Sequence, residues 1–145
     1  MQRTTLYVTS FFALVLLSVT AIGIGAAVDT PRTLMSPVDF TVAKRAIESE
    51  TRVALSRCRD SRGSARELCK AQARAEERVK KADLNARYHG TVVAAEEARL
   101  MRAKAHYEVA KARCGDRLGE ERIDCLRAAR EDRNKSLAHA RLAST

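Results

Sequence analysis

The sequence has no tryptophan, and its three tyrosines and three phenylalanines make up only 4% of its 145 residues. It also has only two prolines, and neither lies beyond position 37. Proline interrupts helices, and aromatic rings are the usual platforms for stacked bases. These two absences favour long helices and disfavour a base-stacking nucleic-acid site.

Common catalytic and ligand-binding motifs are missing as well. The chain has no Gly-x-Ser-x-Gly, His-Glu-x-x-His or Cys-x-x-Cys segment, no glycine-rich phosphate loop and no calcium loop. His89, His106 and His139 lie far apart, and none has a second histidine at helical spacing. We therefore expect no enzyme, and we expect no catalytic residue, cofactor, bound metal or small-molecule substrate.

The first 27 residues are typical of a secretory signal peptide. Arg3 supplies a positive start, a mostly apolar stretch follows at 6–21, and Ala27 with Gly25 at the minus-three position fits a cleavage site. An uncleaved membrane anchor is the alternative, because residues 6–28 are just long enough to span a bilayer. Cleavage would lower the formal net charge from +9 to +8.

The rest of the chain is predicted to be a single all-α domain. Residues 28–36 form an irregular leader, and the domain begins with Ser36 as N-cap, Pro37 at the first helical position and Asp39 in the first turn. Alanine, arginine, lysine and glutamate dominate residues 37–145, a composition typical of exposed helices. Large apolar side chains are sparse, so we expect elongated helical hairpins or a small bundle with a thin core. Ion pairs at i, i+4 spacing are expected for Glu48/Arg52, Glu76/Lys80, Glu77/Lys81 and Glu131/Lys135.

The domain contains an internal repeat with an offset of 56 residues, which indicates two copies at about 42–89 and 91–145. Identical residues at this offset are Val53, Ala54, Arg57, Cys58, Asp60, Gly63, Arg66, Cys69, Ala73, Arg74 and Ala82, which match Val109, Ala110, Arg113, Cys114, Asp116, Gly119, Arg122, Cys125, Ala129, Arg130 and Ala138. Between the copies, Gly90 and Thr91 fit either a helix break or a continuous helix, since one glycine costs a helix only about 1 kcal/mol.

The four cysteines are best explained as two disulfides of an exported protein. An unbroken helix would separate Cys58 from Cys69 by about 16 Å, too far for a disulfide. One solution is a hairpin that turns at Gly63, pairs Cys58 with Cys69, and continues into a capping box at 64–67. The second copy would then turn at Gly119 and pair Cys114 with Cys125.

The alternative keeps both segments helical and packs them antiparallel, with Cys58 bonded to Cys125 and Cys69 to Cys114. That arrangement resembles the twin-cysteine helical hairpins of the mitochondrial intermembrane space. Local hairpins are favoured because a glycine lies at each centre and the signal is of secretory type. A redox role is disfavoured without a Cys-x-x-Cys pair, and a zinc site is disfavoured because zinc ligands usually lie only a few residues apart within a pair.

The segment Tyr107-Glu108-Val109-Ala110-Lys111-Ala112-Arg113-Cys114, continued by Gly119 and Cys125, carries a resemblance to a known group. It resembles small exported proteobacterial proteins that repeat a Tyr-x-x-Ala-x-x-x-Cys, Gly, Cys unit in alanine- and lysine-rich helices. The resemblance covers roughly residues 51–138, and the first copy has Thr51 in place of the tyrosine. It implies a location in the cell envelope and supplies no catalytic residue.

The hypothesis that follows is a non-enzymatic scaffold or interaction protein of the bacterial envelope, located in the periplasm or secreted. Its partner would be an envelope protein, and modest apolar stripes also suggest self-association. The alternative is a basic protein that binds anions such as lipopolysaccharide, lipid or nucleic acid. No specific nucleic-acid motif supports the last of these.

Overall fold

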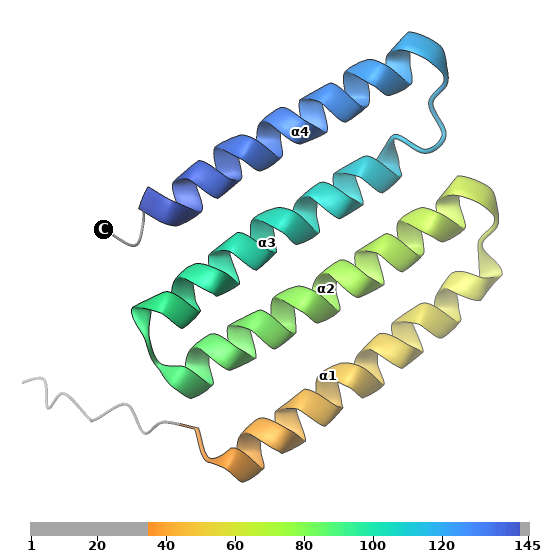
Figure 1. The fold of residues 1–145 in the computed structure, drawn as a ribbon. Coiled ribbons are helices and arrows are strands. Elements are labelled where there is room, and N and C mark those ends of the chain that lie inside the picture. Colours follow the sequence, from red (N-terminus) through yellow and green to blue (C-terminus); the bar gives the residue numbers. More distant parts are fainter. Residues whose placement is uncertain (1–34, 143–145) are drawn as a thin grey trace, which may run out of the picture. The chain divides into compact units, whose positions relative to one another are not determined.

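A computed structural model of the protein describes residues 35–142, which belong to one compact unit (Figure 1). The expected signal peptide at 1–27 and all but the last two residues of the leader lie outside the described residues. The elements are α1 (Pro37–Arg57), the 3-10 turn η1 (Cys58–Asp60), α2 (Gly63–His89), α3 (Val92–Arg113) and α4 (Gly119–Leu142). No strand occurs in the described part of the chain, and the all-α prediction is confirmed.

Local signals in the sequence set several of these boundaries. Ser36 is the N-cap of α1, where its hydroxyl accepts a hydrogen bond from the Asp39 backbone N–H at 3.1 Å. At Gly90 the sequence allowed a helix break or a continuous helix, and the structure has a helix break. Gly90 adopts a left-handed φ of 63° and its N–H donates to the Ala86 carbonyl, while the Thr91 hydroxyl caps α3 by accepting from the Ala94 N–H.

The four helices form a layer in which each helix packs only against its neighbours in sequence. Contacts join α1 to α2, α2 to α3 and α3 to α4, and among residues 35–142 no contact joins α1 to α3 or α4, or α2 to α4. Successive helices run antiparallel, so η1 and the α3–α4 turn lie at one end of the layer and Gly90 at the other (Figure 1). A methyl group on Gly115 would lie 3.8 Å from the Ser64 Cβ, so the α3–α4 turn lies beside the start of α2. Both broad faces of the layer are therefore open.

Alanine forms most of the interior. The buried apolar residues are Ile47, Cys58, Ala73, Ala75, Leu84, Ala94, Ala98, Ala103, Ala105, Cys114, Ala129 and Ala140. Small side chains allow neighbouring helices to approach closely, and the most extensive helix contact, α2 with α3, joins the two hairpins. The core is as thin as expected, but its main component is alanine, which the composition had associated with exposed helices.

Burial at matching positions shows where the layer ends. Ala98 in α3 is 5% exposed, whereas Val42, its match 56 residues earlier in α1, is 60% exposed. Ala75 in α2 is likewise buried, while its match in α4 is the exposed Glu131. The inner helices have neighbours on two sides and the outer helices on only one. None of the four helices combines the length and apolarity that a membrane crossing requires.

Candidate functional site

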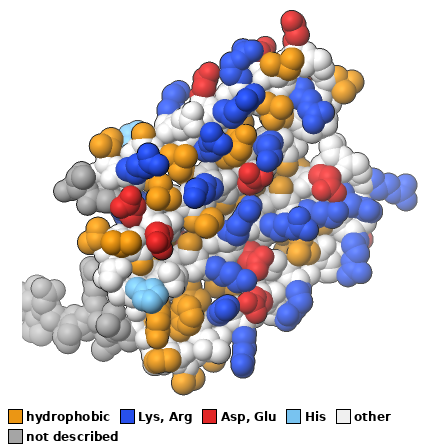
Figure 2. Space-filling model, in the orientation of Figure 1, with side chains coloured by type: hydrophobic (Ala, Val, Ile, Leu, Met, Phe, Trp, Pro, Cys, Tyr) orange, Lys and Arg blue, Asp and Glu red, His pale blue; other side chains and the backbone are white. Residues whose placement is uncertain are grey.

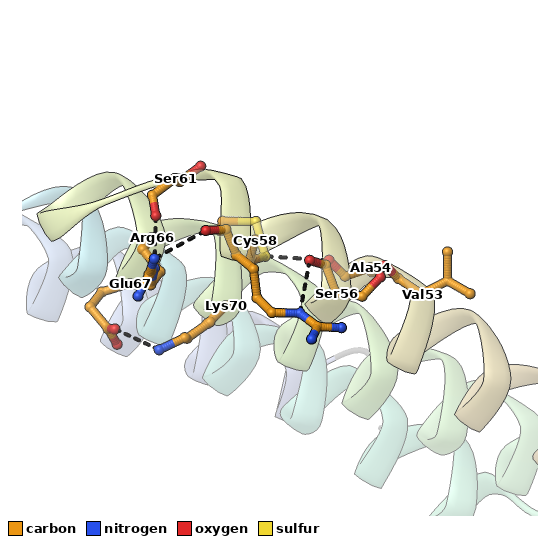
Figure 3. Close-up of a disulfide and its surroundings, with 10 residues drawn as sticks. Val53, Ala54, Ser56, Cys58, Ser61, Arg66, Glu67 and Lys70 are labelled. Carbon is orange, nitrogen blue, oxygen red and sulfur yellow. Dashed lines mark hydrogen bonds and ion pairs between the residues drawn. A yellow bond between two sulfur atoms is a disulfide. The ribbon is translucent and has the colours of Figure 1, made fainter.

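The turn between α1 and α2 is closed by a disulfide between Cys58 and Cys69, whose Cα atoms lie 5.5 Å apart. Cys58 is almost fully buried, and its sulfur lies 3.4 Å from the Ala54 carbonyl oxygen (Figure 3). The α3–α4 turn has the same construction: Cys114 is bonded to Cys125 with a Cα separation of 5.9 Å. The structure therefore has the local pairing, and not the pairing of Cys58 with Cys125 and Cys69 with Cys114.

Gly63 and Gly119 adopt left-handed φ angles of 55° and 56°. Each is the first residue of the second helix of its hairpin, not the last residue of the first. No atom lies within 4 Å of a methyl group placed on either one, so only backbone conformation favours glycine there. The predicted capping box at 64–67 is wrong, because Ser64 already lies inside α2 and Glu67 binds Lys70 instead.

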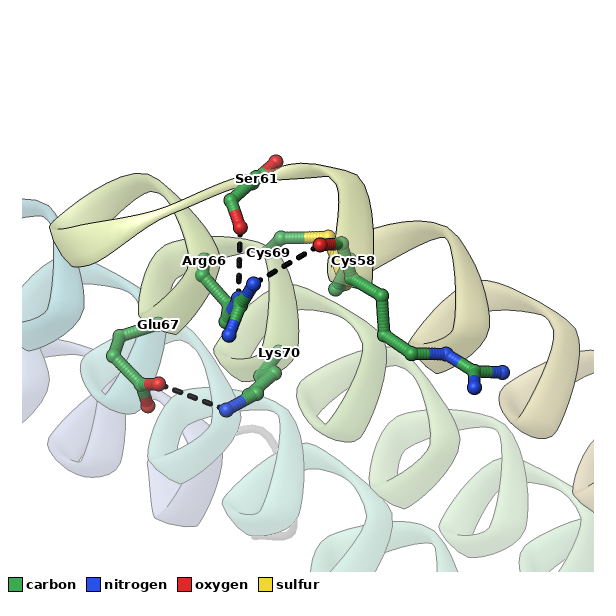
Figure 4. A network of polar contacts seen from close by, with 7 residues as sticks. Cys58, Ser61, Arg66, Glu67, Cys69 and Lys70 are labelled. Atoms are coloured by element: carbon green, nitrogen blue, oxygen red, sulfur yellow. Dashed lines mark hydrogen bonds and ion pairs between the residues drawn. A yellow bond between two sulfur atoms is a disulfide. The ribbon is translucent and has the colours of Figure 1, made fainter.

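Arg66 connects α2 to the preceding turn in a different way, by donating to backbone carbonyls. Its Nε donates to the Ser61 carbonyl at 2.7 Å and its Nη2 to the Arg59 carbonyl at 3.0 Å, so one guanidinium ties α2 to the turn before it (Figure 4). Its match in the second hairpin, Arg122, makes no such contact within residues 35–142. No signal in the sequence indicated this role, since Arg66 and Arg122 are identical at the 56-residue offset and only Arg66 makes these contacts.

Two lysines of α2 bridge it to α1. Lys80 binds Glu50 of α1 at 2.7 Å and Glu76 at 2.8 Å. Its hydrogen bonds to Glu50 and Glu76 raise the pKa of Lys80 above its ordinary value of 10.5. Lys81 binds Glu77 at 2.6 Å and Glu48 of α1 at 3.4 Å, and the hydrogen bond to Glu77 is the main reason why the pKa of Lys81 is also raised.

The expected local ion pairs are therefore only partly present. Glu76/Lys80 and Glu77/Lys81 form, but no ion pair joins Glu48 to Arg52 or Glu131 to Lys135 within the described residues. Glu48 turns to Lys81 of the neighbouring helix instead. Between α2 and α3, Arg102 Nη2 contacts both carboxylate oxygens of Asp83 at 2.8 Å, a pair that helical spacing within one element does not reveal.

Each hairpin has an open groove between its two helices, with volumes of about 390 and 430 Å³. Nine residues of the first match nine of the second at the 56-residue offset: Glu50, Thr51, Val53, Ala54, Arg57, Ala73, Glu76, Glu77 and Lys80 correspond to His106, Tyr107, Val109, Ala110, Arg113, Ala129, Asp132, Arg133 and Ser136. Their chemistry differs. The Glu50–Lys80–Glu76 ion pairs occupy the first groove, whereas Arg133 lies over the Tyr107 ring, 4.6 Å from its centroid, in the second.

These grooves identify the two faces of the layer. A third groove, between α1 and α3 above α2, shares Glu50 and Lys80 with the first, so both open on one side, here called the groove face. Glu48 lies two residues from Glu50 and therefore points to nearly the opposite side of α1. Its partner Lys81 marks the same side of α2.

The side marked by Glu48 and Lys81 is rich in lysine and arginine. Helical spacing from these two residues, together with the 56-residue offset, places the following side chains on it, and they define the basic face: Arg45 and Arg52 of α1, Arg74, Arg78 and Lys81 of α2, Lys104 of α3 and Arg130 of α4. Figure 2 shows a face of the layer on which lysine and arginine spread over the helices and outnumber the acidic side chains. The basic face is the candidate functional site.

Several acidic side chains near this face have a cationic partner, although Glu97, which is exposed seven residues before Lys104, has no ion pair within residues 35–142. Glu48 and Glu77 both bind Lys81, and Glu108 binds Lys111 at 2.8 Å. In contrast, only Lys81 of the seven basic-face cations forms an ion pair within residues 35–142. The other six are Arg45, Arg52, Arg74, Arg78, Lys104 and Arg130. On the groove face, Lys80 and Arg102 are paired with Glu50, Glu76 and Asp83. Arg57, Arg87 and Arg113 line the same grooves and have no ion pair within residues 35–142.

Comparison with protein-family models, with curated proteins and with solved structures found no match. The disulfides themselves indicate an oxidising, non-cytoplasmic compartment.

Proposed function

We propose that the protein is a non-enzymatic, exported helical module of the bacterial cell envelope, located in the periplasm or secreted, which acts as a scaffold or interaction surface. A secretory signal at 1–27 and the resemblance to exported proteobacterial repeat proteins support this location. The two disulfides support it independently, because such bonds persist outside the reducing cytoplasm.

The layer that is one helix thick is the observation that carries the proposal. Each helix contacts only its sequence neighbours, so much of the surface of every helix remains open. Both hairpins are fixed by a disulfide at the same end, which keeps this surface in shape despite a core made mostly of alanine. A rigid layer with two broad faces suits binding better than chemistry in an enclosed site.

A second candidate is an anion-binding protein, and the basic face favours it. Six of its seven cations lack an ion pair within the described residues, so their charge is available to a partner. Arginine and lysine spread over several helices attract anionic groups through charge, without a need for base-specific contacts.

Photo-crosslinking in the cells that make the protein tests the proposal. A photoreactive residue would replace Arg52 on the basic face in one variant and Arg57 on the groove face in another. We expect strong crosslinks to a defined partner from one face and weak ones from the other, in protein whose cysteines are all oxidised. Four free thiols in the recovered protein, or equal and diffuse crosslinking from both faces, would contradict it.

A further inference from the structure

We infer that the basic face binds the surface of an anionic phospholipid bilayer. This inference rests on the proposed exported module and deepens it by naming the partner of one face. The cations of the basic face lie on all four helices. Examples are Arg52 on α1, Arg78 on α2, Lys104 on α3 and Arg130 on α4.

The spread of these charges favours a planar partner. Neighbouring helices pack about 8–10 Å apart, so cations on four successive helices extend across roughly 30 Å. At physiological salt a charge acts over only about 8 Å. A thin polymer that runs parallel to the helix axes would therefore come within this distance of the cations on only one or two helices. A bilayer surface comes within reach of all four, because the helices form a single layer.

The difference between the two faces gives such binding an orientation. On the groove face, Lys80 and Arg102 are neutralised by acidic partners. On the basic face, Lys81 binds Glu48 and offsets its negative charge, which would otherwise oppose an anionic membrane. Long lysine and arginine side chains also reach the headgroups while their stems remain against the helix.

The aromatic residues argue against single-stranded nucleic acid as the partner. The Phe40 and Tyr88 rings contact each other with centroids 4.5 Å apart, and Tyr107 is covered by Arg133 and Lys111. These three are the only phenylalanine and tyrosine residues within 35–142. The described part of the chain therefore has no phenylalanine or tyrosine ring free to stack on bases.

Two variants with the same net charge test the inference. The first replaces Arg52, Arg78 and Lys104 of the basic face by glutamine. The matched control replaces Arg57, Arg87 and Arg113, which line the three grooves on the other face, by glutamine. Each variant loses three charges, one from each of α1, α2 and α3, at exposed positions. Circular dichroism checks that both retain the wild-type helix content.

Binding of the full chain is measured by co-sedimentation at physiological salt with phosphatidylcholine vesicles and with vesicles that also contain phosphatidylglycerol. The readout is the ratio of the two affinities, because the apolar stretch at 6–21 is common to all variants and contributes to both. A basic residue near an anionic surface contributes about fivefold. We expect this ratio to fall on the order of 100-fold in the basic-face variant. In the control variant it should stay within about threefold of the wild-type ratio.

Equal losses in the two variants would overturn the inference, because net charge alone would then explain binding. A wild-type chain with no preference for the anionic vesicles would also overturn it, as would tighter binding to duplex DNA than to those vesicles at the same salt. Failure here is distinct from failure of the proposed module. A chain that crosslinks an envelope protein in cells yet ignores anionic vesicles would lose its lipid partner and remain an interaction module.

Discussion

The Arg66 guanidinium donates through Nε to the carbonyl oxygen of Ser61 at 2.7 Å, across the turn that Gly63 makes. With the second bond to Arg59, it satisfies two backbone carbonyls that follow the end of α1. The disulfide closes this hairpin covalently, and Arg66 closes it with charge-assisted hydrogen bonds. The two hairpins thus have the same disulfide, but only the first has arginine hydrogen bonds across its turn.

Replacement of Arg66 by alanine should lower the free energy of unfolding by about 1–2 kcal/mol, because two hydrogen bonds from a charged donor are lost. Arg122→Ala is the matched control and should change it by less than about 0.5 kcal/mol. Urea unfolding followed by circular dichroism measures both. Equal effects of the two substitutions would show that the hydrogen bonds of Arg66 contribute nothing specific.

Removal of the first disulfide by Cys58→Ser with Cys69→Ser should cost about 2–3 kcal/mol of stability, and removal of the second by Cys114→Ser with Cys125→Ser should cost a similar amount. Each bond closes a loop of 11 residues, which restricts the unfolded chain. Thermal unfolding of each double variant gives these values.

Peptide mapping under non-reducing conditions checks the pairing behind that prediction. Trypsin cleaves after arginines that lie between Cys58 and Cys69, so a linked peptide pair from this one turn is expected. A fragment that joins Cys58 to Cys125 would contradict the local hairpins.

Enlargement of the alanine at the centre of the layer should be costly. Ala105 is fully buried, and Ala105→Leu should destabilise the fold by about 1–3 kcal/mol through overpacking. Ser49 occupies the matching position in α1, where it is exposed, so Ser49→Leu should stay within about 0.5 kcal/mol. Urea midpoints compare the two variants. A tolerated leucine at 105 would mean that the helices are not packed as closely as alanine permits.

The lysine bridges predict a dependence of stability on alkaline pH. Glu50 and Glu76 raise the pKa of Lys80 above 10.5, so the stabilisation from this site is complete below about pH 10 and is lost as the pH rises beyond 10.5. Lys80→Met keeps most of the side-chain stem and removes the charge. The difference in urea midpoint between wild type and this variant should therefore shrink above pH 10.5. A difference that stays constant up to pH 11.5 would count against the ion pairs.

The sequence predicted the disulfide pairing and the turns well, because few backbone geometries can join Cys58 to Cys69 with Gly63 between them. A disulfide fixes a short distance, a left-handed φ favours glycine, and the same spacing recurs at Cys114 and Cys125. Composition was equally sufficient for the all-α class, since no proline interrupts residues 38–145.

The interior and the polar contacts could not be predicted in the same way. Alanine is compatible with both surface and core, so its sequence positions did not distinguish the buried Ala105 from the exposed Ala128. Glu48 has Arg52 at favourable spacing on its own helix but binds Lys81 of α2, because tertiary packing brings that lysine closer. The basic face depends on the same kind of information, since it exists only once the four helices are aligned.

The contact of each helix with only its sequence neighbours also affects how the chain can fold. No native contact requires the two ends of the domain to meet, so loop-closure entropy stays small at every step, and chains with such local contacts fold quickly. Each disulfide needs cysteines only 11 residues apart, so the first hairpin can form and oxidise before the second hairpin folds. A protein exported from its N-terminus could therefore complete its structure one hairpin at a time, without rearrangement of its disulfides.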